Sequence, residues 1–194
     1  MHSSLPTLET PRLLLRPCTY EDEDDLYRLY WHTFPGNVDC PKDKPCRPNR
    51  RDIHEENAYY MDFIHSSLLR SFGRIIIVRK EDGAKIGTCL FVPHVFTPEE
   101  VALCADPENG LTRFGTLEVI IHGVVDREYR GMGYTTEVAE ALVNYGLNDL
   151  HLDRVLSESV FDNMASIHVM KHIGMEIVTP PNSKQVIGLL RRNK

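Results

Sequence analysis

The stretch LEVIIHGVVDREYRGMGYTTE, residues 117–137, predicts a strand, a tight turn and a helix in succession. Its apolar, β-branched run from Val119 to Val125 is typical of a buried strand. Gly131 and Gly133 then form a Gly-x-Gly turn, after which apolar residues recur at helical spacing from Val138 to Tyr145. Such a turn directs free backbone N–H groups and the positive end of a helix dipole at one point. That point suits a phosphate group.

The glycine spacing excludes two common nucleotide-binding motifs. A dinucleotide-binding fingerprint would need a third glycine at the position of Thr136, and a P-loop would need Gly-Lys-Ser/Thr, which the chain lacks. A Gly-x-Gly turn with Arg130 before it remains. Either Thr135 or Thr136 can cap the helix, and Glu137 suits its first turn.

Three other stretches accompany the turn. They are LETPRLLLRP (residues 8–17), KIGT (residues 85–88) and NMASIHVM (residues 163–170), which closes on residues 173–175. Together with residues 126–137, which come third along the chain, they make four motifs. In their order along the chain these motifs resemble the RimJ/RimL-like branch of the GNAT superfamily of acyl-CoA-dependent N-acetyltransferases. The resemblance covers nearly the whole chain. It implies an α/β (α+β) fold: a mixed, mostly antiparallel central sheet of about seven strands flanked by about four helices, in one domain over residues 1–194.

The resemblance also implies acetyl-CoA as co-substrate and no metal. In the family, backbone amides of the turn bind the pyrophosphate and the pantetheine arm pairs with the central strand. The matching positions here are Val124, Val125, Arg130, Gly131, Met132, Gly133, Tyr134 and Thr135, with Asn163 on the later helix. Two positions depart from the family pattern. At the first position of the consensus Q/R-x-x-G-x-G/A, where the family has Gln or Arg, this chain has Glu128. At the position where many members have a tyrosine that protonates the leaving thiolate, it has Met170.

Acetyl transfer to an amine needs a base, and two strand residues are candidates. Glu118, Ile120 and His122 alternate onto one face of the predicted strand. Burial of Glu118 would raise the pKa of its carboxyl towards the working pH, although an edge or salt-bridged role is the alternative. His122 titrates in the right range, and Gly123 beside it indicates a bulge that would re-aim its ring. A structural histidine with satisfied hydrogen bonds is the alternative, and the more frequent one.

The leaving thiolate needs a proton donor. Ser166 is the candidate, because it lies at the fourth position of Asn-x-x-Ser in the first turn of its helix. Its alternative role is support of the cap that Asn163 sets.

The sequence therefore predicts an N-acetyltransferase that transfers acetyl directly to a primary amine in a ternary complex. The acceptor is a protein N-terminal α-amine, as the resemblance implies, or a small-molecule amine. A catalytically weak acyl-CoA-binding sensor or interaction module is the alternative, which Glu128 and Met170 keep open.

Composition sets further limits. A net charge of −6 and a pI of about 5.8 argue against a nucleic-acid partner and favour cationic ones. No apolar stretch is long enough for a membrane helix and residues 1–17 lack a signal-peptide pattern, so we expect a cytoplasmic protein without a membrane partner; a homodimer is left open. The five cysteines indicate free thiols. Cys40 and Cys46 with His32 and His54 match no compact zinc motif.

The remaining elements follow from periodicity and turn residues. A solvated acidic start at residues 21–25 opens a helix capped by Thr19, and Asp82-Gly83 marks a hairpin. A helix capped by Asp162 or Asn163 ends at Gly174. We predict strands at residues 12–16, 74–79, 85–92, 154–160, 176–179 and 185–190, a helix from Asp52 to Gly73, and loops at residues 34–51 and 95–115, the latter a lid or specificity element.

Overall fold

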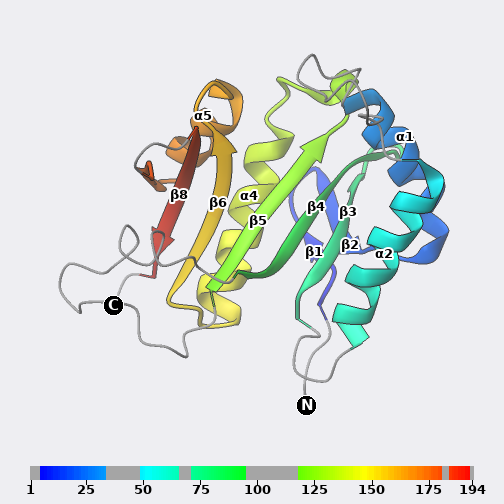
Figure 1. Ribbon diagram of the computed structural model, residues 1–194, viewed down its shortest axis with the longest axis horizontal. Coiled ribbons are helices and arrows are strands. Elements are labelled where there is room, and N and C mark those ends of the chain that lie inside the picture. Colours follow the sequence, from blue (N-terminus) through cyan, green and yellow to red (C-terminus); the bar gives the residue numbers. More distant parts are fainter. Residues whose placement is uncertain (1–4, 34–48, 66–70, 95–117, 181–183, 193–194) are drawn as a thin grey trace. The chain divides into compact units, whose positions relative to one another are not determined.

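The computed structural model describes residues 5–33, 49–65, 71–94, 118–180 and 184–192. Within them the chain forms eight strands and four α-helices (Figure 1). The strands are β1 (Leu8–Glu9), β2 (Leu13–Pro17), β3 (Gly73–Arg79), β4 (Lys85–His94), β5 (Glu118–Val125), β6 (Arg154–Val160), β7 (Glu176–Val178) and β8 (Gln185–Arg191). The helical segments are α1 (Glu23–Thr33), α2 (Arg50–His65), α4 (Tyr134–Asn144) and α5 (Met164–His172), the short 3-10 turns η1 (Tyr20–Asp22) and η2 (Arg127–Tyr129), and the π-helical turn η3 (Tyr145–Asp149).

The strands follow one another in the sheet in the order β1-β2-β3-β4-β5-β6-β8-β7. Pairs β1–β2, β2–β3, β6–β8 and β7–β8 are antiparallel, whereas β5 and β6 run parallel. The predicted mixed, mostly antiparallel sheet with helices is confirmed. The strand absent from the prediction is β1, a two-residue segment too short to give a periodic signal, which pairs with β2 through Leu8 and Leu15.

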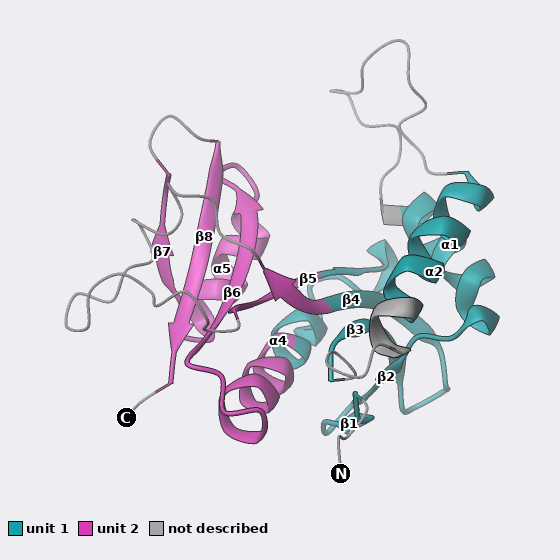
Figure 2. Ribbon diagram, turned by 60° about the horizontal axis from the view of Figure 1, so that its bottom comes forward, with its two compact units in different colours: residues 1–90, 123–138 teal, residues 91–122, 139–194 magenta. Residues whose placement is uncertain are grey.

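The chain divides into two compact units, coloured separately in Figure 2. The first comprises residues 1–90 and 123–138, and the second residues 91–122 and 139–194. In the first, α1 packs on α2 and α2 on β3, around a core that contains Leu26, Ile53 and Ile76. In the second, the core includes Ile120, Leu156 and two residues of β8, Ile187 and Leu189.

Two helix starts differ from the prediction. α2 begins at Arg50 instead of Asp52, because Asn49 and Asp52 cap each other: each side chain accepts the other's backbone N–H, at 3.0 and 2.9 Å. α4 begins at Tyr134, so Thr135 and Thr136 lie inside its first turn instead of capping it.

The acidic start of the first helical segment is not solvated throughout, which corrects the prediction. Asp22 is fully buried. Its carboxylate closes a capping box with Thr19 and pairs with Arg16 and Lys85, at 2.6 and 2.8 Å. These bonds outweigh the opposing effect of burial and hold the pKa of Asp22 far below its ordinary value. The sequence could not reveal this, because Lys85 lies on a distant strand.

Other predictions agree with the structure or fall outside it. Gly83 adopts a φ of +73° in the predicted hairpin turn, and Asn163 is the cap of α5. Most of the predicted loop at residues 34–51, and all of that at 95–115, lies outside the described residues. The second helix was predicted to reach Gly73, but Gly73 is the first residue of β3; α2 is described to His65, and residues 66–70 lie outside the described residues. None of the described helices is both long and apolar enough to span a membrane.

Candidate functional site

The first unit holds the Gly-x-Gly turn between β5 and α4. Gly131 and Gly133 have φ values of +76° and +80°, a region that other residues rarely adopt. Both are exposed, and a Cβ placed on Gly131 would meet no atom within 4 Å. The first N–H of α4 that reaches an acceptor one turn back is that of Glu137, which donates to the Gly133 carbonyl at 3.1 Å. The N–H groups of residues 134–136 therefore have no acceptor inside the helix.

Asp126 fixes the start of this turn. Its backbone N–H donates to the Ile86 carbonyl at 2.8 Å. Its carboxylate is almost fully buried and accepts a hydrogen bond from Arg28 at 2.8 Å, and its Oδ2 lies 3.2 Å from His32 Nδ1. Two side chains of α1 therefore hold the residue at which the turn leaves β5.

The predicted cofactor-binding residues fall into two groups, those with exposed and those with buried side chains. Arg130, Met132 and Thr135 are exposed, whereas Val125 and Tyr134 are buried. The Tyr134 ring faces the Arg12 guanidinium, so this residue offers only backbone to a ligand. Arg130 Nε donates to the Val125 carbonyl at 3.2 Å. Val124 is half-buried, and its carbonyl lies so close to Gly87 that a Cβ there would overlap it.

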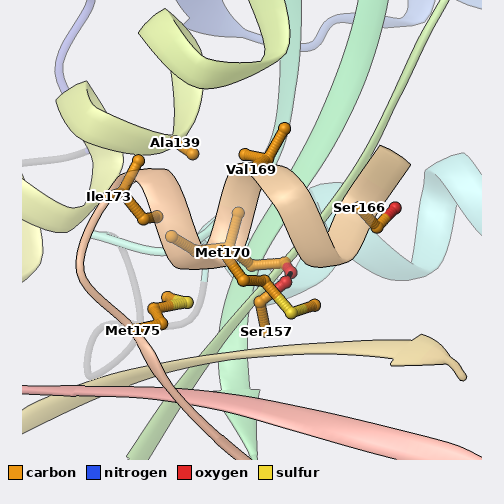
Figure 3. A pocket seen from close by; sticks show the side chains of 8 residues that line it. Ala139, Ser157, Ser166, Val169, Met170, Ile173 and Met175 are labelled. Atoms are coloured by element: carbon orange, nitrogen blue, oxygen red, sulfur yellow. Dashed lines mark hydrogen bonds between the residues drawn. The ribbon is translucent and has the colours of Figure 1, made fainter. Parts of the chain in front are cut away.

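The second unit contains a parallel strand pair with a cavity on one face. Val119, Ile120 and Ile121 of β5 pair with Val155, Leu156 and Ser157 of β6. At the last pair, Ser157 Oγ donates to the Ile121 carbonyl at 3.1 Å. Here lies a small, mostly apolar cavity of about 50 Å³ (Figure 3). It is lined by Ile121, Ala139, Ser157, Ser166, Val169, Met170, Ile173 and Met175.

Helix α5 contributes Ser166 and Met170 to this cavity. Asn163 Oδ1 accepts the backbone N–H of Ser166 at 3.3 Å, so the Asn163 side chain serves the helix cap. Ser166 is one of the lining residues, and its hydroxyl makes no hydrogen bond to another described residue. Met170 is buried, and its sulfur would lie only 2.9 Å from a Cβ placed on Gly188, which is too close for a real contact. The glycine therefore lets α5 approach the sheet.

The opposite face of the strand pair carries the other predicted catalytic residues. Because side chains two apart share a face, Glu118, Ile120 and His122 stand beside Arg154, Leu156 and Glu158, respectively. Arg154 Nε donates to Glu118 Oε2 at 2.7 Å, and both side chains are about 95% buried. This is the geometry of the salt-bridged alternative for Glu118. Its role as a base stays a prediction.

His122 is part of a cluster with Glu158 and His94. The Glu158 carboxylate lies 3.9 Å from His122 Nε2 and 3.7 Å from His94 Nε2. Burial lowers the pKa of His122 below its ordinary value of 6.5; the nearby His94 adds to this effect and Glu158 opposes it. His122 is therefore mostly neutral at pH 7 and able to accept a proton.

Cysteine and metal chemistry have little support in the described chain. Cys18 and Cys89 are buried, and burial raises the pKa of each thiol to about 12. Among the described residues no group of three or more potential ligands is placed to hold a metal ion. Among the four residues considered as zinc ligands, His32 pairs with Asp126 and His54 pairs with Glu23. Cys40 and Cys46 lie outside the described residues.

A family model described as the acetyltransferase (GNAT) domain matches residues 12–176. An uncharacterized N-acetyltransferase of Bacillus licheniformis, p20, is 26% identical over 172 residues, which are 89% of this chain and 83% of that protein. The chain belongs to the GNAT acetyltransferase family and is an acetyl-CoA-dependent acetyltransferase.

Two solved structures share the fold. One is RimL, an α-N-acetyltransferase of a ribosomal protein in complex with coenzyme A, with a TM-score of 0.68 and 12% identity over 98% of each chain. The other is apo FdhC, a GNAT enzyme for a nucleotide-linked sugar, with a TM-score of 0.70 and 14% identity over 95% of this chain and 89% of that one. At these identities the likeness establishes the fold alone.

The sequence reasoning missed several residues that contact the predicted sites, among them Arg12, His94, Arg154 and Glu158. Glu158 could have been predicted from strand alternation. It lies on the same face of β6 as Arg154 and Leu156, just as His122 lies on the same face of β5 as Glu118. Arg12 has no local signal, since its partners lie more than 100 residues away.

We predict that Glu118→Gln lowers the free energy of unfolding by about 3 kcal/mol, because it leaves the Arg154 cation buried and unbalanced. Chemical denaturation measures the loss. The control is Glu176→Gln, which removes an exposed pair with Arg191 and should cost less than about 1 kcal/mol. A stable Glu118→Gln variant with strongly reduced turnover on an alkyl amine would contradict the structural role and support the residue as the base.

Proposed function

We propose that the protein transfers the acetyl group of acetyl-CoA directly to the α-amine of a peptide or protein N-terminus, in a ternary complex. One observation carries the proposal: the parallel pair β5–β6 has on one face a mostly apolar cavity with Ser157 and Ser166 in its lining, and on the other a histidine–carboxylate cluster. These are the two kinds of group that direct acyl transfer needs. One protonates the leaving thiolate, and the other accepts a proton from the amine.

The turn of the first unit fits the pyrophosphate of the co-substrate. Its glycines are exposed and adopt positive φ, and a Cβ on Gly131 would point into open space. The N–H groups of residues 134–136, together with the helix dipole, favour an anion there. Residues 130–135 would bind the phosphates through backbone, as the family resemblance implies, and Val124 and Val125 would pair with the pantetheine arm.

The cavity of the second unit suits the thioester end. It is mostly apolar, and the Ser166 hydroxyl is free to donate a hydrogen bond to a sulfur atom. Met170, which lies next to it at the family's tyrosine position, has no proton to donate. Ser166 is therefore the donor to the leaving thiolate, a fair leaving group that needs only modest help. In this proposal Asn163 acts through the helix cap and does not contact the cofactor.

On the opposite face, His122 is the proposed base and Glu158 its positioning residue. Glu118 is a poorer candidate, because Arg154 already holds its carboxylate. Glu158 faces both His122 and His94, so the carboxylate stabilises whichever imidazole becomes charged. A proton accepted by His122 therefore gains a nearby counter-charge.

The basicity of His122 bears on the choice of acceptor. Its pKa lies below 6.5, whereas an alkyl ammonium has a pKa near 10.4 and an α-ammonium one near 8. At pH 7 about a tenth of an α-amine is already neutral, against less than about a thousandth of an alkyl amine. A weak base therefore serves an α-amine better. The RimL neighbour acts on such an amine, which supports the same choice.

The thiols of Cys18 and Cys89 do not favour an acetyl-enzyme intermediate. Both are buried, and their raised pKa values leave almost no thiolate at neutral pH. Direct transfer requires no such nucleophile. The proposal therefore predicts that acetyl-CoA and the amine must be bound together before CoA is released.

The first test is CoA release across an amine panel. Short peptides with free N-termini should be acetylated with kcat/KM at least about tenfold above that for polyamines and lysine-like amines, because their amines are more often neutral. The same peptides with blocked N-termini are the control. Preference for an alkyl amine would contradict the proposed acceptor, and CoA release no faster than background with every amine would favour the sensor alternative.

The second test concerns Ser166. Ser166→Ala should lower kcat about ten- to a hundredfold and leave acetyl-CoA affinity nearly unchanged, because the hydrogen bond strengthens mainly in the transition state. Ser166→Thr keeps a hydroxyl and should recover part of the rate. Equal activity of all three proteins would exclude Ser166 as the donor.

The third test is the pH dependence of kcat/KM on a peptide. Only neutral His122 accepts a proton, so the rate should fall as the pH drops through a pKa below 6.5. His122→Gln should abolish this acidic limb. His172→Gln, which changes an exposed histidine at the end of α5, is the control and should keep it. Titration of the peptide ammonium lowers the rate below a pH of about 8 in every variant, but a further fall below pH 6.5 in His122→Gln would assign the base elsewhere.

A further inference from the structure

Arg12, immediately before β2, contacts three residues of the Gly-x-Gly turn and the helix that follows. Its Nη1 donates to the Met132 carbonyl at 2.8 Å. Its backbone N–H and Nε donate to the two carboxylate oxygens of Glu137, at 2.9 and 2.6 Å. Its guanidinium carbon lies 4.5 Å from the centre of the Tyr134 ring. Thr10 Oγ1 adds a further hydrogen bond to Glu137.

The bond to Met132 has a consequence for the next N–H group. In a trans peptide the carbonyl of one residue and the N–H of the next point in opposite directions. Because the Met132 carbonyl points to Arg12, the Gly133 N–H points away from it. Arg12 also lies against the Gly133 backbone, since a Cβ placed there would be 3.4 Å from Nη2. The arginine therefore limits how the Met132–Gly133 peptide can turn.

The bond to Glu137 has a consequence for charge. Glu137 lies in the first turn of α4, where its carboxylate would repel an anion bound at the helix start. Burial alone would raise the pKa of this carboxyl, but hydrogen bonds from Thr10 and from the backbone and side chain of Arg12 lower it below its ordinary value. Glu137 is therefore charged, and the Arg12 cation offsets that charge.

We infer that Arg12 is a positioning residue for the phosphate-binding turn: it directs the Gly133 N–H away from the Arg12 side chain and offsets the charge of Glu137. The inference rests on the proposed binding of the acetyl-CoA pyrophosphate at residues 130–135. Arg12 acts through the turn, and it is not a catalytic residue. Its loss should therefore weaken the binding of acetyl-CoA and leave the chemical step unchanged.

The test is Arg12→Lys. Lysine keeps the charge, but its single ammonium group cannot reproduce a planar fork that reaches Glu137 and Met132 together. The dissociation constant of acetyl-CoA, measured by calorimetry, should rise about tenfold, the usual effect of losing one charge-assisted hydrogen bond. The KM for acetyl-CoA should rise in parallel, while kcat at saturating acetyl-CoA stays within about twofold of the wild-type value.

Arg16→Lys is the matched control, because Arg16 lies nearby on β2 and holds buried Asp22 through the same kind of paired bonds. It should lower the melting temperature at least as much as Arg12→Lys, whose side chain is about half exposed, and leave acetyl-CoA affinity unchanged.

Unchanged affinity in folded Arg12→Lys, or an equal loss in both variants, would overturn the role of Arg12. Failure of the wild-type protein to bind acetyl-CoA would instead refute the proposed function.

Discussion

The first N–H groups of α4 have no acceptor within the helix, and the arrangement around them in the first unit depends on this constraint. Hydrogen bonding inside α4 begins only with the Glu137 N–H, which reaches Gly133. Such groups cost free energy unless water, a side chain or a ligand satisfies them. Here they follow an exposed turn with two glycines at positive φ. The turn is held on one side by Asp126 and on the other by Arg12, so that it is open to a ligand and yet fixed.

The second unit has a different physical basis. A parallel strand pair places alternate residues on opposite faces, so that a single pair of strands carries two chemical environments. One face has a small apolar cavity with the Ser166 hydroxyl. The other face changes from an ion pair, Glu118 with Arg154, through apolar Ile120, to His122 beside Glu158. In the proposed reaction, one face supplies the donor to the thiolate and the other supplies the base.

Local patterns in the sequence predicted most of the fold. The β-branched run at Val119–Val125, the Asp82-Gly83 turn and the Asn163 cap each have a short-range physical cause, and each appears in the structure where expected. The predicted start of α4 was wrong by two or three residues, since a cap at Thr135 or Thr136 places the first helical residue later than Tyr134, which is already helical. Helix ends depend on which neighbour supplies a hydrogen bond, and this information is not local.

The candidate site was less predictable, because its side chains are paired across long sequence separations. Glu118 has a carboxylate suited to catalysis, and only the register of β5 on β6 reveals that Arg154 holds it. The sequence predicts a solvated Asp22, and only the fold brings Arg16 and Lys85 beside its carboxylate. Arg12 forms part of a motif for the first strand, but nothing in that motif identifies Met132 and Glu137 as its partners.

Hydrogen exchange with and without acetyl-CoA tests the central claim most directly, because it reports on the backbone N–H groups themselves. If these groups bind the pyrophosphate, saturating acetyl-CoA should slow exchange at residues 130–136 by at least about tenfold. The exposed hairpin at residues 81–83 should show no change. Calorimetry would establish whether acetyl-CoA binds tightly. Tight binding with unaltered exchange at residues 130–136 would contradict the account.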